Sequence, residues 1–139
     1  MDWHPLIVHF PLALLPVAAG LDLAALLARR SNWHNWAYAA LVLGVVGAVA
    51  SVLSGTAAAE GEEGAQADLV VVHEDWATWS LVLFIAVVLG RLPLHLQSRL
   101  QGWPIRAWTA VAAAGCLLLW RAAYLGGELV YKHGIGVEY

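Results

Sequence analysis

The chain has 139 residues, of which 61% are hydrophobic and 12% charged, with a formal net charge of −3 and a mean hydropathy of +0.70. A soluble domain of this size would carry far more charge, so the composition excludes an ordinary soluble fold and predicts a protein of the lipid bilayer. Cys116 is the single cysteine. It excludes an intrachain disulfide, and the chain lacks the Cys-x-x-Cys-His motif of c-type haem attachment. We expect no nucleic-acid partner.

Four apolar stretches follow one another along the chain. They cover about residues 5–27, 36–59, 76–94 and 105–125, each close to the roughly 20 residues that cross the hydrocarbon of a membrane. Tryptophans stand near their ends, as interfacial aromatic belts require: Trp3, Trp33, Trp36, Trp76, Trp79, Trp103 and Trp108. The sequence therefore predicts one all-α domain over residues 1–139, an integral membrane four-helix bundle with a C-terminal tail over 126–139.

The first span contains three prolines. Pro5 suits a first helical turn, whereas Pro11 and Pro16 remove backbone hydrogen bonds inside the span and predict a bend. Small residues lie below His9 at helical spacing (Ala13, Pro16 and Gly20). This stripe predicts a groove or, alternatively, tight packing against another helix.

The second and third spans also carry rows of small residues. The rows are Ala40, Gly44 and Ala48; Gly47, Ser51 and Gly55; and, below His73, Ala77, Ser80 and Phe84. Close helix packing explains the glycines, but it does not explain a histidine at the head of a row. The polar segment Thr56–Asp68 predicts an outer loop, and Arg91, near the end of the third span, is expected to snorkel to the interface.

Arg121 is the costly residue of the fourth span. It lies about 9 Å inside the predicted end of the helix, where an unpaired guanidinium is unfavourable. Three interpretations stay open: a structural pair with Glu128 on the same stripe, snorkelling to the headgroups, or an anchor for an anionic group such as a haem propionate or a quinone oxygen. The tail mixes glycines with apolar residues and is expected to fold back over the outer end, bringing His133 with it.

Charge counting predicts the topology. Five of the seven basic residues fall on one side of the predicted spans: Arg29, Arg30, Arg91, Arg99 and Arg106. The positive-inside rule makes that side cytoplasmic. Asp22 is the single acid in the cytoplasmic half. Both termini are then extracytoplasmic, and the expected location is the inner membrane of a bacterium.

The same count gathers four histidines at the outer end: His4, His9, His73 and His133. Ionisable groups at membrane depth are costly and mark functional sites, and neutral imidazole is a common ligand of haem iron, copper and zinc. His34 and His95 fall on the opposite rim, where we interpret them as interfacial residues.

Two segments carry a family resemblance. The first is His4-Pro5-Leu6-Ile7-Val8-His9-Phe10-Pro11, and the second is Gly126-Gly127-Glu128-Leu129-Val130-Tyr131-Lys132-His133-Gly134. Together they resemble the small bacterial membrane proteins called domain of unknown function 2231, over nearly the whole chain. The resemblance implies a four-helix membrane domain. Some such proteins are joined to Rieske-type iron–sulfur domains, which implies redox work at the outer face.

The expected function is that of a b-type haem protein that passes electrons at the periplasmic face, more an electron-transfer protein or redox subunit than a stand-alone enzyme. Two axial imidazoles favour electron transfer over oxygen chemistry. His9 and His73 are the first choice of ligands because each heads a stripe on a helix, with Arg121 near the propionates. His4 and His133 are then supporting groups or a second site, so one haem or two stay open. A periplasmic redox protein of the Rieske or cytochrome type, a quinone and a second copy of the chain are the candidate partners beside the lipid.

The alternative is a copper or zinc site that binds, senses or transports the ion. It would use the ligands His4, His9, His73 and His133 with Glu74 or Glu128, since imidazole suits both metals. A purely structural bundle is the third interpretation, and it leaves the clustered histidines unexplained.

Overall fold

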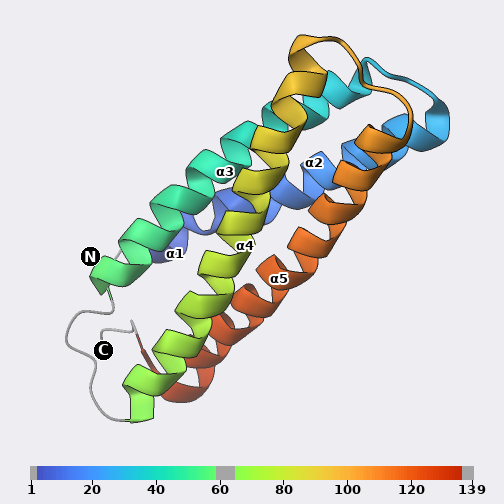
Figure 1. Cartoon of the computed structure of the whole chain (residues 1–139). Coiled ribbons are helices and arrows are strands. Elements are labelled where there is room, and N and C mark those ends of the chain that lie inside the picture. Colours follow the sequence, from blue (N-terminus) through green and yellow to red (C-terminus); the bar gives the residue numbers. More distant parts are fainter. Residues whose placement is uncertain (1–2, 59–64, 136–139) are drawn as a thin grey trace.

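The computed structural model describes residues 3–58 and 65–135, and within these ranges the chain is a bundle of long helices (Figure 1). The elements are α1 (His4–Ile7), α2 (His9–Ala28), α3 (Trp33–Ala58), α4 (Ala65–Leu96) and α5 (Trp103–His133). Four helical stretches in this described part are long and apolar enough to cross a membrane, namely His4–Ala28, Trp33–Ala57, Ala67–Leu96 and Trp103–His133. The predicted all-α membrane fold is confirmed.

The four long helices form a ring in which each packs against two antiparallel neighbours. Helix α2 packs mainly on α3, and α4 mainly on α5, while α3–α4 and α2–α5 close the ring with smaller contacts. Leu15, Leu41, Phe84 and Val87 are almost completely buried at the centre. We call the end of the bundle that holds His4 and His73 the histidine end. The opposite end, with the connections 29–32 and 97–102, is the hairpin end.

Helices α4 and α5 are longer than a membrane is thick. With 32 and 31 residues, each is about 46–48 Å long at 1.5 Å per residue, against a hydrocarbon thickness of about 30 Å. The predicted spans 76–94 and 105–125 therefore mark the apolar part of each helix, and the helices continue beyond it at the histidine end.

The expected fold-back of the tail is wrong for the residues up to His133, because they extend α5. Gly134 ends the helix in the left-handed conformation (φ 66°), and its N–H donates to the carbonyls of Leu129 and Val130. The predicted outer loop Thr56–Asp68 is also shorter than expected, since α3 runs to Ala58 and α4 begins at Ala65. Residues 59–64, which include Glu60, Glu62 and Glu63, lie outside the described residues.

The first span is broken at Val8, between α1 and α2. Pro11 has no N–H to offer the carbonyl of Ile7, so the helix cannot run evenly through this point. After the break, α2 buries Pro11, Leu15, Ala18, Asp22 and Ala25. His9, Ala13 and Gly20 are exposed instead. The stripe predicted below His9 therefore faces away from the bundle, whereas the row below His73 points inward, with Ser80 and Phe84 buried.

The two halves of the chain have the same internal construction. Leu15 packs on Gly44, where a Cβ would lie 2.6 Å from the leucine side chain; Phe84, 69 positions later, packs on Gly115, 71 positions after Gly44. Arg29, directly after α2, and Ser98, two residues after α4, are also 69 apart, and both have φ 53°. The next N–H in each case, of Arg30 and Arg99, donates to the carbonyls of Ala25 and Leu94.

This correspondence makes α1–α2–α3 and α4–α5 two equivalent helical hairpins. Both run in the same direction, so an approximate two-fold axis lies along the bundle, as in membrane proteins with parallel internal repeats. Each position in α1–α2 has its counterpart 69 residues later in α4, and each position in α3 has its counterpart 71 residues later in α5.

Candidate functional site

His4 lies in the first turn of the chain's first helix and rests on a glycine of α3. A Cβ on Gly55 would come within 2.9 Å of the imidazole Cε1, so a larger residue here would require the ring to shift. The Nδ1 atom is 2.9 Å from Ser54 Oγ. Because the Ser54 hydroxyl donates to the carbonyl of Ser51, its oxygen accepts from Nδ1–H. This places the lone pair of the ring on Nε2.

His73 is held in the same way by the other half. A Cβ on Gly126 of α5 would lie 2.9 Å from the Cε1 atom of His73. The Nδ1–H group donates to the carbonyl of Ala122 at 2.9 Å. A carbonyl can only accept, so this bond also fixes the lone pair on Nε2. His73 and Gly126 are the repeat counterparts of His4 and Gly55, and the two rings have matching tautomers.

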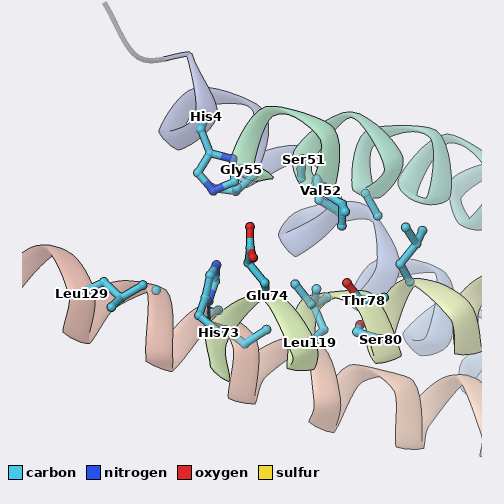
Figure 2. A pocket seen from close by; sticks show the side chains of 18 of the residues that line it. His4, Ser51, Val52, Gly55, His73, Glu74, Thr78, Ser80, Leu119 and Leu129 are labelled. Carbon is cyan, nitrogen blue, oxygen red and sulfur yellow. Dashed lines mark hydrogen bonds between the residues drawn. The ribbon is translucent and has the colours of Figure 1, made fainter. Parts of the chain in front are cut away.

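Both rings line one cavity of about 350 Å³ between the halves. Figure 2 shows His4 and His73 pointing toward one another from α1 and α4, with the carboxylate of Glu74 projecting between them. The walls below are mainly apolar, with Leu81 and Leu119 among them. Glu74 Oε1 and Ser80 Oγ are buried, and neither has a hydrogen-bond partner within the described part of the chain. The cavity therefore combines two electron-pair donors with an apolar interior.

His9 and His133 do not line this cavity. The His9 ring is exposed, and its Nδ1 atom donates to the carbonyl of Pro5 at 2.5 Å. His133 is exposed at the last residue of α5. Of the four histidines predicted to converge, the structure brings together His4 and His73. Residues 3–58 and 65–135 contain no group of three or more His, Cys, Asp or Glu side chains that could hold a metal ion.

Arg121 is exposed on the outside of α5 and does not line the cavity. Its guanidinium carbon lies 5.9 Å from the centre of the Trp76 ring and 5.6 Å from that of Tyr124. Glu128 instead forms an ion pair with Lys132 and accepts a hydrogen bond from the Tyr124 hydroxyl. The pair with Glu128, one of the three open interpretations of Arg121, is not formed as a direct ion pair, and the two charges act on each other only at longer range.

A second polar cluster, which the sequence analysis missed, is buried near the hairpin end. Arg91 donates from both terminal nitrogens to the two carboxylate oxygens of Asp22. His34 Nδ1 donates to the same carboxylate at 2.7 Å. All three side chains are at most 2% exposed. The expectations that Arg91 snorkels and that His34 is interfacial are wrong, because each has a partner inside the bundle. The sequence feature that could have indicated this cluster was Asp22, the single acid on the predicted cytoplasmic side, where most arginines lie.

His95 lies close to this cluster. Its ring stacks on Tyr38 with centroids 4.5 Å apart, and the Arg91 guanidinium lies 5.7 Å from the centre of the same tyrosine ring. Tyr38 donates its hydroxyl to the carbonyl of Val88. Aromatic stacking and one hydrogen bond therefore join α3 to α4 beside the ion pair.

Comparison with known proteins gives one match. The family model described as "Predicted membrane protein (DUF2231)" matches residues 2–139. No curated protein and no solved structure matches the chain.

Proposed function

The chain belongs to the DUF2231 family of predicted membrane proteins, and we propose that it is a b-type haem protein that transfers electrons at the periplasmic face of a bacterial inner membrane. The observation that carries this proposal is the pair His4 and His73. They come from opposite halves of the bundle, share one cavity and present the same ring nitrogen as electron-pair donor.

The donor chemistry fits haem iron. A histidine ligand commonly donates its second ring N–H to a carbonyl or another acceptor, which fixes the ring and increases its basicity. Ala122 and Ser54 provide these acceptors here. The largely apolar walls suit a porphyrin. When bound, haem with two axial imidazoles would supply reversible one-electron exchange.

The ligand assignment that the geometry favours is His4 with His73. It replaces His9, whose ring is exposed and bonded within its own helical turn. Gly55 and Gly126 let each ring lie against a helix backbone. Glu74 places a carboxylate between the two rings (Figure 2); its negative charge would favour the oxidised state of a bound iron.

The test is an absorption spectrum of protein purified from haem-supplied cells. We expect sharp α and β bands in the reduced protein, and protohaem on pyridine extraction. His4→Ala and His73→Ala should each remove the low-spin spectrum, whereas His9→Ala and His133→Ala should keep it. A colourless protein with stoichiometric copper or zinc would contradict the haem proposal and support the metal alternative. Loss in His9→Ala with retention in His4→Ala would restore the pairing of His9 with His73.

A further inference from the structure

Arg121 forms no direct ion pair in the described part of the chain, and the charge of Glu128 acts on it only at longer range. Glu128, the acid on its stripe, is held by Lys132 and by the Tyr124 hydroxyl. The guanidinium lies over the rings of Trp76 and Tyr124 instead. Aromatic rings contact the face of a guanidinium and leave the N–H groups at its edge for other acceptors. An exposed cation beside two aromatic rings is therefore available to an anion from outside the chain.

The position of Arg121 along the helix corresponds to the level of lipid phosphates. It is 18 residues beyond Trp103, the first residue of α5, a distance of about 27 Å along the axis. On α4, Trp76 is 20 residues before Leu96, or about 30 Å. Both distances match a hydrocarbon thickness of about 30 Å, so Arg121 and Trp76 lie at the boundary between hydrocarbon and headgroups on the side of the histidine end.

An apolar groove starts at the same level on the outside of α4. It has a volume of about 540 Å³ and is lined below Trp76 by Trp79, Val82, Leu83, Ala86 and Leu118. From Trp76 to Ala86 the groove follows ten residues of helix, about 15 Å. That length is half the hydrocarbon thickness of about 30 Å, which is the depth of one leaflet.

We propose that this surface binds one phospholipid of the leaflet at the histidine end. The phosphate oxygens accept hydrogen bonds from the edge of the Arg121 guanidinium, whose planar fork suits a phosphate. One acyl chain occupies the groove from Trp76 down to Ala86. The charge of Arg121 and the leaflet-long apolar groove together select a phospholipid over a soluble anion or a neutral lipid. This site shares Asp75 with the lining of the His4 and His73 cavity, but its other lining residues differ and the lipid contacts do not depend on haem.

The test is native mass spectrometry of the delipidated full-length protein in detergent, titrated with phosphatidylglycerol or with diacylglycerol carrying the same acyl chains. We expect one tightly retained phosphatidylglycerol and about tenfold weaker retention of diacylglycerol, since a hydrogen bond to a charged group contributes about that factor. Arg121→Gln should weaken phosphatidylglycerol retention by about tenfold. Ala86→Trp, which fills the foot of the groove, should weaken the retention of both lipids.

Two matched controls separate this site from a general loss of charge or structure. Arg106→Gln removes an exposed arginine of the same helix near its other end, and should leave retention unchanged. Asp75→Asn changes the acid at the rim of the groove, and should leave binding unchanged or strengthen it. Equal retention by Arg121→Gln and the native protein would overturn the proposal. Equal binding of the two lipids, or a loss in Asp75→Asn as large as that in Arg121→Gln, would also overturn it.

Discussion

The two ends of the bundle use equivalent positions of the two halves in opposite ways. At the histidine end the counterparts are the same residue, His4 and His73, held on glycines in the same tautomer. At the hairpin end the counterparts are Asp22 and Arg91, which carry opposite charges and bond to each other. A carboxylate and a guanidinium satisfy one another. Two imidazoles that both present Nε2 as an acceptor cannot hydrogen-bond to each other through those atoms, which agrees with the haem ligation proposed above.

The two ends also differ in packing: the halves are in direct contact at the hairpin end, and a cavity separates them at the histidine end. The hairpin end holds the halves together by the buried ion pair of Asp22 and Arg91, although Arg91 Nε and His95 Nδ1 have no hydrogen-bond partner in the described part of the chain. In this chain the equal pair, His4 and His73, lines the cavity, and the complementary pair, Asp22 and Arg91, joins the two halves.

Membrane orientation gives the largest expected effect, because its outcome is all or none. Arginines near the hairpin end predict that this end is cytoplasmic and that the histidine end faces outward. A reporter fused after Tyr139 that is active only outside the cytoplasm should be active, and one that works only in the cytoplasm should be silent. The reverse result would place the histidine cavity inside the cell and refute its periplasmic role.

Breaking the ion pair at the hairpin end should have the next largest effect. Arg91→Leu leaves the Asp22 carboxylate buried without its guanidinium, and should lower the free energy of unfolding by about 3–5 kcal/mol. Asp22→Leu should have an effect of similar size. The double variant should be more stable than either single variant, because no isolated charge is left behind.

These changes can be measured by thermal unfolding in detergent micelles, with the exposed Arg99→Leu as the control. Additive losses in the double variant would mean that Asp22 and Arg91 do not act as a pair.

The two glycines that contact the histidine rings, Gly55 and Gly126, predict an intermediate effect on stability. Gly126→Ala places a methyl group against His73, an overpacking that costs about 1–3 kcal/mol. Gly127→Ala is the matched control, since nothing lies within 4 Å of its Cβ, and alanine should stabilise the helix by up to about 1 kcal/mol. The two variants should thus shift the unfolding temperature in opposite directions, and only Gly126→Ala should weaken haem retention. Equal shifts of the unfolding temperature would show that the His73 ring does not require a glycine at position 126.

Removing the hydrogen-bond acceptor of one proposed haem ligand, His4, should have the smallest effect. Ser54→Ala deletes the oxygen that accepts from His4 Nδ1–H, and should weaken haem affinity by about tenfold or somewhat more. Thr56→Val is the control: this hydroxyl also lines the cavity, but it donates within its own helix, to the carbonyl of Val52. Haem titration of both variants, followed by absorbance, makes the comparison. Similar losses in the two would assign the effect to cavity polarity.

The membrane fold was predictable because a lipid-crossing helix needs a run of apolar residues, and such a run is visible in the sequence. The ends of the helices were not predictable in this way. Residues such as Gly126 and Glu128 continue a helix outside the hydrocarbon, where no apolar run is required. Hydropathy identifies the part of a helix that crosses the membrane, but it does not identify the part that projects beyond the membrane.

The residue type of the candidate site was predictable from the sequence, but which histidines share the cavity was predictable only in part. The sequence indicated that histidines gather at one end, and the structure places His4 and His73 in one cavity. His9 was the preferred ligand because its spacing assumed one continuous helix, and the break at Val8 turns that stripe outward. The ion pair of Asp22 and Arg91 depends on packing between residues 69 positions apart, which no local pattern reveals.

The pairing of Asp22 with Arg91 also limits the symmetry of the molecule. Two halves of identical sequence would place two copies of the same side chain at this buried point, and two like charges there would repel each other. This ion pair therefore requires a single chain whose two halves differ in sequence, and two copies of one hairpin could not form it. The two histidines need no such difference, so one bundle is symmetric at the histidine end and asymmetric at the hairpin end.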